Sequence, residues 1–307
     1  MSAASDFDLA WPFIDVHAHV GTTVNRTPPV GQSFEKYLAR MAQSNIVAAI
    51  PSTAGGGPRE RGILDVRDQN DATAAGCRRY SDRFPIGLAL LEAGFGQAAA
   101  DEIGRAMGEA GLAGLMCHPG MSGHALDATL HPALEVVDAR GGLALLHVGG
   151  RDASPTAAGE LARRFRRTTF IMAHVSMNEA QHRESITAFA GLENVWCDFA
   201  QHPGHPTSAS GTSGPWDIAD LVRGLSASRL LFGSDTPYYD YRYLQQEIEA
   251  ARIDPPRKDR ITWANAVDVI RRFRPDWTPP RTPPEVPPEF DGVDVWQHQP
   301  GKPLRLA

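Results

Sequence analysis

The alternation of short apolar segments with longer amphipathic stretches is the feature of this sequence that most restricts its fold. Eight segments rich in Ile, Val, Leu and Phe are predicted to be strands: Phe13–His17, Ile46–Ile50, Ile86–Leu91, Gly114–Cys117, Leu143–His147, Phe170–His174, Val195–Asp198 and Leu230–Phe232. The 217 residues from Phe13 to Leu230 hold seven repeats of about 31 residues, close to the ~30 residues that one βα unit needs. The pattern therefore predicts an α/β fold, a (β/α)8 TIM barrel.

Capping residues and prolines indicate helices between these segments. Ser33 can cap a helix that runs through Met41, and Ser154 followed by Pro155 is typical of a helix start. Beyond the eighth predicted strand, residues 240–252 and 259–273 are expected to form two closing helices.

The composition changes at Pro275. Nine of the chain's 24 prolines fall in the last 33 residues, and so proline-rich a segment cannot form a helix or a central strand. We therefore expect a barrel domain over residues 1–274 and a proline-rich C-terminal arm over residues 275–307. Trp277, Phe290 and Trp296 could anchor the arm on its own barrel or on a neighbouring subunit of a homo-oligomer, and a loose tail is the alternative.

Composition and charge restrict the class of partner. Hydrophobic residues make up 42% and charged residues 21% of the chain, as in globular proteins with a large core. The net charge of −6 and the lack of a long basic run argue against nucleic acid and anionic membranes, so a small-molecule substrate is expected. The amino end lacks a basic leader, and no apolar stretch reaches the ~18 residues of a membrane span, which predicts a cytoplasmic protein.

Candidate metal ligands stand at the ends of four apolar segments. His17 and His19 are separated by one residue, so a strand would place both imidazoles on one face. His147 and His174 end the fifth and sixth predicted strands, and Asp235 follows the eighth. Barrel enzymes keep their chemistry at this edge of the sheet, where these side chains could converge on one divalent ion.

Each of these residues has a simpler explanation when it is taken alone. Most His-x-His pairs lie on the surface or in the core, and a single histidine at a strand end can be a satisfied core group. An aspartate after Gly-Ser, such as Asp235, could merely cap the next helix. Their joint occurrence on successive strands favours the metal site.

The same segments resemble the motifs of the amidohydrolase superfamily. Within it, the chain is similar to the amidohydrolase-related group that contains the aminocarboxymuconate-semialdehyde decarboxylase-like enzymes. The resemblance runs in order from Phe13 to about Phe273. Its motifs are Ile14-Asp-Val-His17-Ala-His19, Met116-Cys-His118-Pro119, Leu146-His147-Val-Gly149, Ile171-Met-Ala-His174, Phe232-Gly-Ser-Asp235-Thr-Pro237 and Ala264-Asn265-Ala266.

The resemblance implies a ligand set and two catalytic residues. His17, His19, His147 and Asp235 would bind a divalent ion, usually zinc. His174 would contact the substrate or the metal-bound water, and Asp235 could exchange a proton with that water. These roles are carried over from the family motifs at matching positions of this sequence.

The lysines of the chain indicate how many ions the site holds. Relatives with two ions use a carbamylated lysine on the fourth strand. This chain has no lysine between Lys36 and Lys258. A single divalent ion is therefore expected.

Two reactions fit such a centre, and the ligand set does not separate them. The first is hydrolysis of a small amide, lactone or ester by a metal-activated water. The alternative is decarboxylation of a small unsaturated or aromatic acid. Candidate substrate-binding residues are His118, Arg151 and Tyr238, although an exposed loop residue is the more frequent case for an arginine such as Arg151. A barrel that binds a metal or ligand without turnover is a third hypothesis, which the complete ligand set disfavours.

Overall fold

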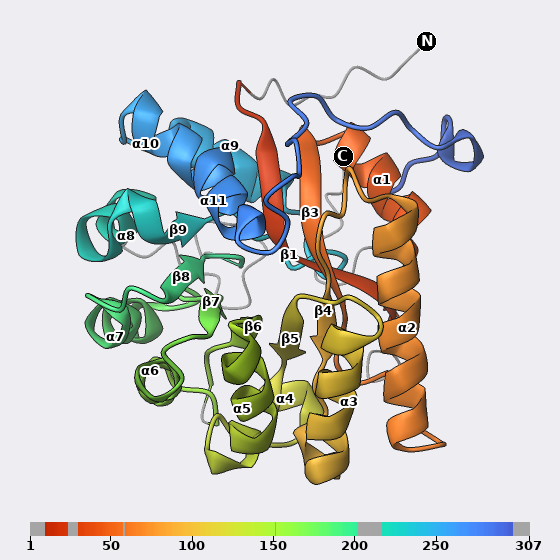
Figure 1. Ribbon diagram of the computed structural model, residues 1–307. Helices are drawn as coiled ribbons and strands as arrows, with labels where there is room; N and C mark the ends of the chain where they lie inside the picture. The colour runs from red at the N-terminus through yellow and green to blue at the C-terminus, as the bar shows by residue number, and fades with distance from the viewer. Residues whose placement is uncertain (1–9, 24–29, 58, 151, 202–216, 297–307) are drawn as a thin grey trace.

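A curved nine-stranded sheet organises the protein in the computed structural model, which describes residues 10–23, 30–57, 59–150, 152–201 and 217–296 (Figure 1). The strands are β1 Phe13–Thr23, β2 Val30–Gln32, β3 Ile46–Thr53, β4 Leu88–Leu90, β5 Gly114–Cys117, β6 Leu143–His147, β7 Thr169–Ala173, β8 Val195–Asp198 and β9 Leu230–Leu231. Their order is β2-β1-β3-β4-β5-β6-β7-β8-β9, and every pair except β1 with β2 is parallel. Sequential order and parallel pairing are those of a TIM barrel.

The chain after β9 closes the sheet against β1. The Val16 amide donates to the Phe232 carbonyl at 3.0 Å, and the Asp235 amide donates to the His17 carbonyl at 2.8 Å. Ala18 and Thr236 form an additional parallel bridge. The segment that carries Asp235 therefore lies directly beside the segment that carries the His-x-His pair.

Eleven α-helices are found in the described part of the chain, and most of them cover the outer face of the sheet (Figure 1). They are α1 Phe34–Ala42, α2 Ile63–Arg79, α3 Gln97–Gly108, α4 Pro119–Ser122, α5 His131–Arg140, α6 Pro155–Arg164, α7 Glu179–Phe189, α8 Ile218–Leu225, α9 Arg242–Ala250, α10 Pro255–Asp259 and α11 Asn265–Arg271. Ser33 and Ser154 cap α1 and α6, as predicted: their side chains accept from the Lys36 and Ala157 amides. No helix in these described ranges combines the length and the apolar character needed to cross a bilayer.

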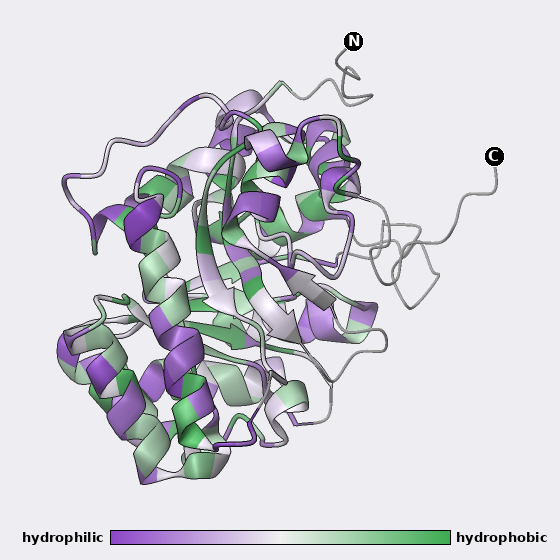
Figure 2. Ribbon diagram, turned by 90° about the vertical axis from the view of Figure 1, so that its right-hand side faces the viewer, coloured by the Kyte–Doolittle hydropathy of each residue, from purple (hydrophilic) through white to green (hydrophobic). Residues whose placement is uncertain are grey.

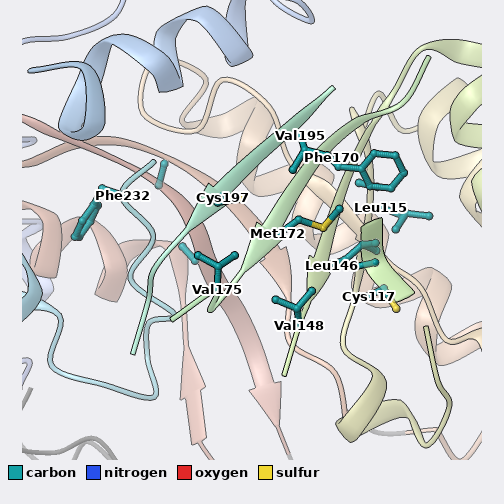
Figure 3. Close-up of a cluster of buried hydrophobic side chains, with 14 of the residues drawn as sticks. Leu115, Cys117, Leu146, Val148, Phe170, Met172, Val175, Val195, Cys197 and Phe232 are labelled. Atoms are coloured by element: carbon teal, nitrogen blue, oxygen red, sulfur yellow. The ribbon is translucent and has the colours of Figure 1, made fainter. Parts of the chain in front are cut away.

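Two apolar clusters lie on opposite faces of the strands. Phe170 and Met172 of β7 pack toward the outer helices in one cluster, part of which Figure 3 shows. Ile171 and Ala173 of the same strand belong to the second cluster, which fills the inside of the barrel and includes residues of α11. Figure 2 shows the same layering, with apolar residues along the central strands and hydrophilic residues on the outward sides of many helices.

Strand β1 is longer than the predicted strand, and its pairing with β3 is irregular beside the histidine pair. It continues to Thr23, so the His-x-His pair lies inside the strand and not at its end. Ile14 and Val16 belong to the inner cluster, whereas Ala18 belongs to the outer one. The register with β3 shifts between Asp15 and Ala18, and this irregularity changes which face each residue presents. Strict alternation from Ile14 would have turned both histidines toward the outer helices.

Other expectations need smaller corrections. The antiparallel strand β2 was not predicted, because three residues are too few for a periodic signal. The strand predicted over Ile86–Leu91 is shorter, with β4 covering Leu88–Leu90. The helix expected over residues 259–273 is three pieces, α10, a π-helical turn over Arg260–Ala264 and α11.

The described part of the proline-rich arm packs on its own barrel. Its only regular element among residues 275–296 is a short turn of 3-10 helix over Pro288–Phe290. Trp277 Nε1 donates to the Asp82 carbonyl at 3.1 Å, and Arg83 Nη1 donates to the Thr282 carbonyl at 2.6 Å. A homo-oligomer with the arm at its interface and the domain boundary at residue 275 stay predictions.

Candidate metal centre

Four side chains from three parts of the barrel bring donor atoms together around His17 Nε2, and the groups that could hold an ion are His17, His19 and His147, and His17, His174 and Asp235. His17 and His19 come from β1, His147 ends β6, and Asp235 follows β9. His17 Nε2 lies 3.1 Å from His19 Nε2 and 3.2 Å from His147 Nε2. Asp235 Oδ1 lies 3.4 Å from His17 Nε2 and 3.2 Å from His19 Nε2. All four side chains are buried.

The spacing of these atoms fits a divalent cation. Zinc binds nitrogen and oxygen at ~2.0–2.2 Å, so ligand atoms around one ion lie about 3 to 3.5 Å apart. Asp235 Oδ1 is buried and accepts no hydrogen bond of adequate geometry. A buried carboxylate oxygen without a partner costs free energy, and a cation at the shared point would remove that cost. The residues present therefore fit a metal ion.

The other ring nitrogen of each histidine is fixed by a neighbour. His17 Nδ1 lies 3.0 Å from Asp198 Oδ2, and His19 Nδ1 lies 3.1 Å from Ser52 Oγ. His147 Nδ1 lies 3.0 Å from His174 Nε2. Such partners set the tautomer and the ring orientation of metal-binding histidines. They leave all three Nε2 atoms facing the common point.

Asp198 is a site residue that the sequence reasoning missed. It is fully buried at the end of β8, and its Oδ1 accepts the amides of His174 at 3.1 Å and Ala200 at 3.0 Å. A Cβ atom added to Gly233 would lie 2.7 Å from Asp198 Cγ and 2.9 Å from His17 Cβ, so only glycine leaves room for this pair. The available signal was its position, since Asp198 ends an apolar strand as His147 does.

The chain turns sharply after three successive strands to present side chains to the centre. His174, Gln201 and Asp235 follow β7, β8 and β9 and have φ angles of 60°, 59° and 53°, in the left-handed region. Residues other than glycine adopt this region at some cost. Gln201 Nε2 donates to Asp235 Oδ2, and His174 Nε2 lies 3.8 Å from the same oxygen. The three residues with this unfavourable backbone conformation are thus residues whose side chains lie at the donor cluster.

The buried histidines and carboxylates of the cluster shift one another's pKa values. Burial would raise the pKa of Asp235, but His174, His19 and His17 hold it well below its usual range, so the carboxylate stays ionised. Burial would lower the pKa of His17, but Asp198 and Asp235 outweigh it and raise this pKa to about 9. Burial and the neighbouring histidines lower the pKa of His147. The cluster thus keeps its carboxylates charged in a buried site.

Two of the three candidate substrate-binding residues lie beside the donors. The His118 ring centroid is 4.2 Å from that of His147, and the Tyr238 ring centroid is 5.7 Å from that of His19. His118 Nδ1 accepts the Met121 amide at 3.2 Å, so the proton of its neutral ring is on Nε2. Burial lowers the pKa of His118 to about 3, which keeps the ring neutral. Arg151 lies outside the described residues.

Comparison with models of protein families shows which family the chain belongs to. The model described as "Amidohydrolase" matches residues 14–272, most of the barrel. The chain belongs to the amidohydrolase family. The resemblance inferred from the strand-end motifs is thereby confirmed. No curated protein sequence matches the chain significantly.

Solved structures with a similar fold include three proteins described as decarboxylases. A 2,6-dihydroxybenzoate decarboxylase in complex with 2,6-dihydroxybenzoate has a TM-score of 0.64 and 16% identity, over 87% of this chain and 99% of that one. The 5-carboxyvanillate decarboxylase of Sphingomonas paucimobilis has a TM-score of 0.61 and 16% identity, over 85% and 99%. The dihydroxybenzoic acid decarboxylase of Polaromonas sp. JS666, with bound manganese and 2-nitroresorcinol, has a TM-score of 0.63 and 16% identity, over 85% and 97%. At these identities the likeness establishes the shared TIM-barrel fold.

Proposed function

We propose that the protein is a metal-dependent decarboxylase of a small aromatic or unsaturated carboxylic acid. The observation that carries the proposal is an apolar wall next to the donor cluster. Tyr238 and Ala54 are buried there, with Met121 and Tyr239 packed against them. Tyr238 also contacts the ring of His19. A flat apolar substrate could pack on this wall while its polar groups face the donors.

The ligand set is proposed to be His17, His19, His147 and Asp235. When bound, a divalent ion would be coordinated by oxygens of the substrate and would polarise them. Zinc is the ion expected from the family resemblance, and manganese is named in the descriptions of two solved structures of similar fold. Both ions are therefore candidates.

Two neighbouring histidines would bind the substrate and donate the proton. In decarboxylation the bond from the ring carbon to the carboxylate breaks, carbon dioxide leaves, and the ring carbon takes up a proton. His118 can donate a hydrogen bond from Nε2 to a substrate oxygen. Burial lowers the pKa of His174, and its Nδ1 has no hydrogen-bond partner. A proton held on His174 would therefore be given up readily to the substrate carbon.

The solved relatives favour this reaction over the first expectation from the sequence. The three named above are described as decarboxylases of hydroxylated aromatic acids. Hydrolysis of a small amide, lactone or ester remains the second candidate. The buried Asp235 Oδ1, which has no hydrogen-bond partner among the described residues, favours it, since a carboxylate can take a proton from water and pass it to a leaving group. Arg151 would serve either reaction as an anchor for a substrate anion.

An assay of products separates the reactions. The purified protein, supplied with zinc or manganese, is incubated with hydroxybenzoic acids and, separately, with small lactones, esters and amides in ¹⁸O-labelled water. We expect carbon dioxide release from a hydroxybenzoic acid and replacement of the carboxylate by solvent hydrogen. Incorporation of ¹⁸O into the products of a lactone, ester or amide, without carbon dioxide release, would identify a hydrolase instead. No turnover of either class by the metal-loaded protein would favour a binding protein.

A further inference from the structure

Arg40 of α1 is a buried cation that joins the C-terminal arm to the barrel. Only 2% of its surface is exposed. Its Nε and Nη2 donate to the Val295 carbonyl at 3.1 and 3.0 Å, and its Nη1 donates to Gln32 Oε1. Burial of a guanidinium is costly unless its N–H groups have acceptors. The arm supplies an acceptor that keeps Arg40 in this position.

The end of the described arm is itself held firmly. Trp296 is 3% exposed, and its Nε1 donates to Gln43 Oε1 at 2.8 Å. Its ring meets the Tyr241 ring edge-on, with centroids 5.1 Å apart, and the Arg242 guanidinium lies 4.1 Å from its centroid. These contacts place the adjacent Val295 carbonyl against Arg40.

Gln32 of β2 connects Arg40 to the backbone of the donor cluster. Its Nε2 donates to the His19 carbonyl at 2.9 Å, and its Oε1 also accepts from Thr236 Oγ1 at 3.3 Å. The His19 amide in turn donates to the Thr236 carbonyl at 2.8 Å. Gln32 therefore binds both sides of the junction between β1 and the chain after β9. One side carries His19 and the other carries Asp235.

We propose that the end of the C-terminal arm is a positioning element of the donor cluster. The arm fixes Arg40, which orients Gln32, which holds the two segments that present His19 and Asp235. Neither the arm nor the two connecting side chains contributes a donor atom. The inference rests on the metal centre of the proposed function, and it would hold for either reaction.

Two truncated chains test the proposal. One ends at Asp291 and loses Val295 and Trp296, whereas the matched control ends at Trp296 and keeps every contact described above. Each metal-free protein is titrated with Zn²⁺ and Mn²⁺ in competition with a chromophoric chelator. We expect the shorter chain to bind metal about 10-fold or more weakly than the full chain, as for lost outer partners of metal ligands. The control should differ from the full chain by less than about twofold.

A substitution within the full-length chain makes the test independent of truncation. Arg40→Met keeps an unbranched apolar stem but removes the donors, and should weaken metal binding about as much as the shorter truncation does. Combined with that truncation, it should add little, because both changes break one connection. Circular dichroism and denaturant unfolding identify any variant that fails to fold, and the other then carries the test.

The histidine side-chain ¹⁵N signals of the metal-free proteins give a readout that needs no metal. We expect these signals to change in the shorter chain and in Arg40→Met, but not in the control. If the full chain binds no metal while these changes occur, the metal proposal fails and the positioning role stands. Folded variants with unchanged metal affinity and unchanged histidine signals would overturn the positioning role.

Discussion

Replacement of Asp235 by asparagine is expected to remove most metal binding and to lower kcat/KM by ~10³-fold or more. Among the described residues, it deletes the only anionic donor of the proposed ligand set. Asp235 Oδ1 lies within 3.4 Å of two histidine nitrogens and accepts no hydrogen bond of adequate geometry. Asparagine has nearly the same shape, so packing should survive. Its amide is also a much weaker ligand than a carboxylate.

The metal content and the activity of Asp235→Asn are measured against a matched control. Asp276→Asn changes the same chemical group on an exposed side chain, which is 77% accessible, and should behave like the unaltered protein. Circular dichroism and denaturant unfolding should show that both variants are folded. Retention of full metal content and activity in Asp235→Asn would refute the assignment of this residue as a ligand.

Replacement of Asp198 by asparagine is expected to weaken metal binding by about 10- to 100-fold without removing a donor atom. The Asp198 carboxylate fixes the His17 ring through Nδ1 and also binds the backbone of the two segments that follow β7 and β8. Asparagine can accept at one oxygen only, so at least one buried donor loses its partner. We expect a loss of about 1–3 kcal/mol in the free energy of unfolding of the metal-free protein.

Chelator competition and denaturant unfolding measure the two effects of Asp198→Asn. Ser52→Ala is the comparison, because it removes the neutral partner of His19 Nδ1. It should weaken metal binding less, since a neutral hydroxyl orients an imidazole less strongly than a carboxylate does. An unchanged metal affinity in Asp198→Asn, with the fold intact, would mean that His17 needs no such support.

Local sequence signals were sufficient to predict the barrel and to place candidate ligands at the ends of its strands. The repeat of about 31 residues predicted the order of the strands, because each βα unit is a local structure. His147 and Asp235 could be placed because the ends of parallel strands meet at one edge. Their approach to within hydrogen-bond distance of the His-x-His pair then depends on closure of the sheet by the chain after β9.

The parts that could not be predicted depend on contacts between distant segments or on small backbone irregularities. The register shift in β1 that turns His17 and His19 inward leaves no periodic signal in five residues. Asp198 lies 181 residues from His17, and nothing local distinguishes it from other strand-end aspartates. The contact of Arg40 with Val295 spans 255 residues, so it could be found only in three dimensions.

The most direct test of the metal centre is the stoichiometry of metal binding. Metal-free protein is titrated with Zn²⁺ and with Mn²⁺, and the bound metal is counted by elemental analysis after gel filtration, beside the His17→Ala protein. The proposed centre predicts about one ion per chain in the unaltered protein and a large loss in His17→Ala. No bound metal in the folded, unaltered protein, or one ion per chain in both proteins, would contradict it.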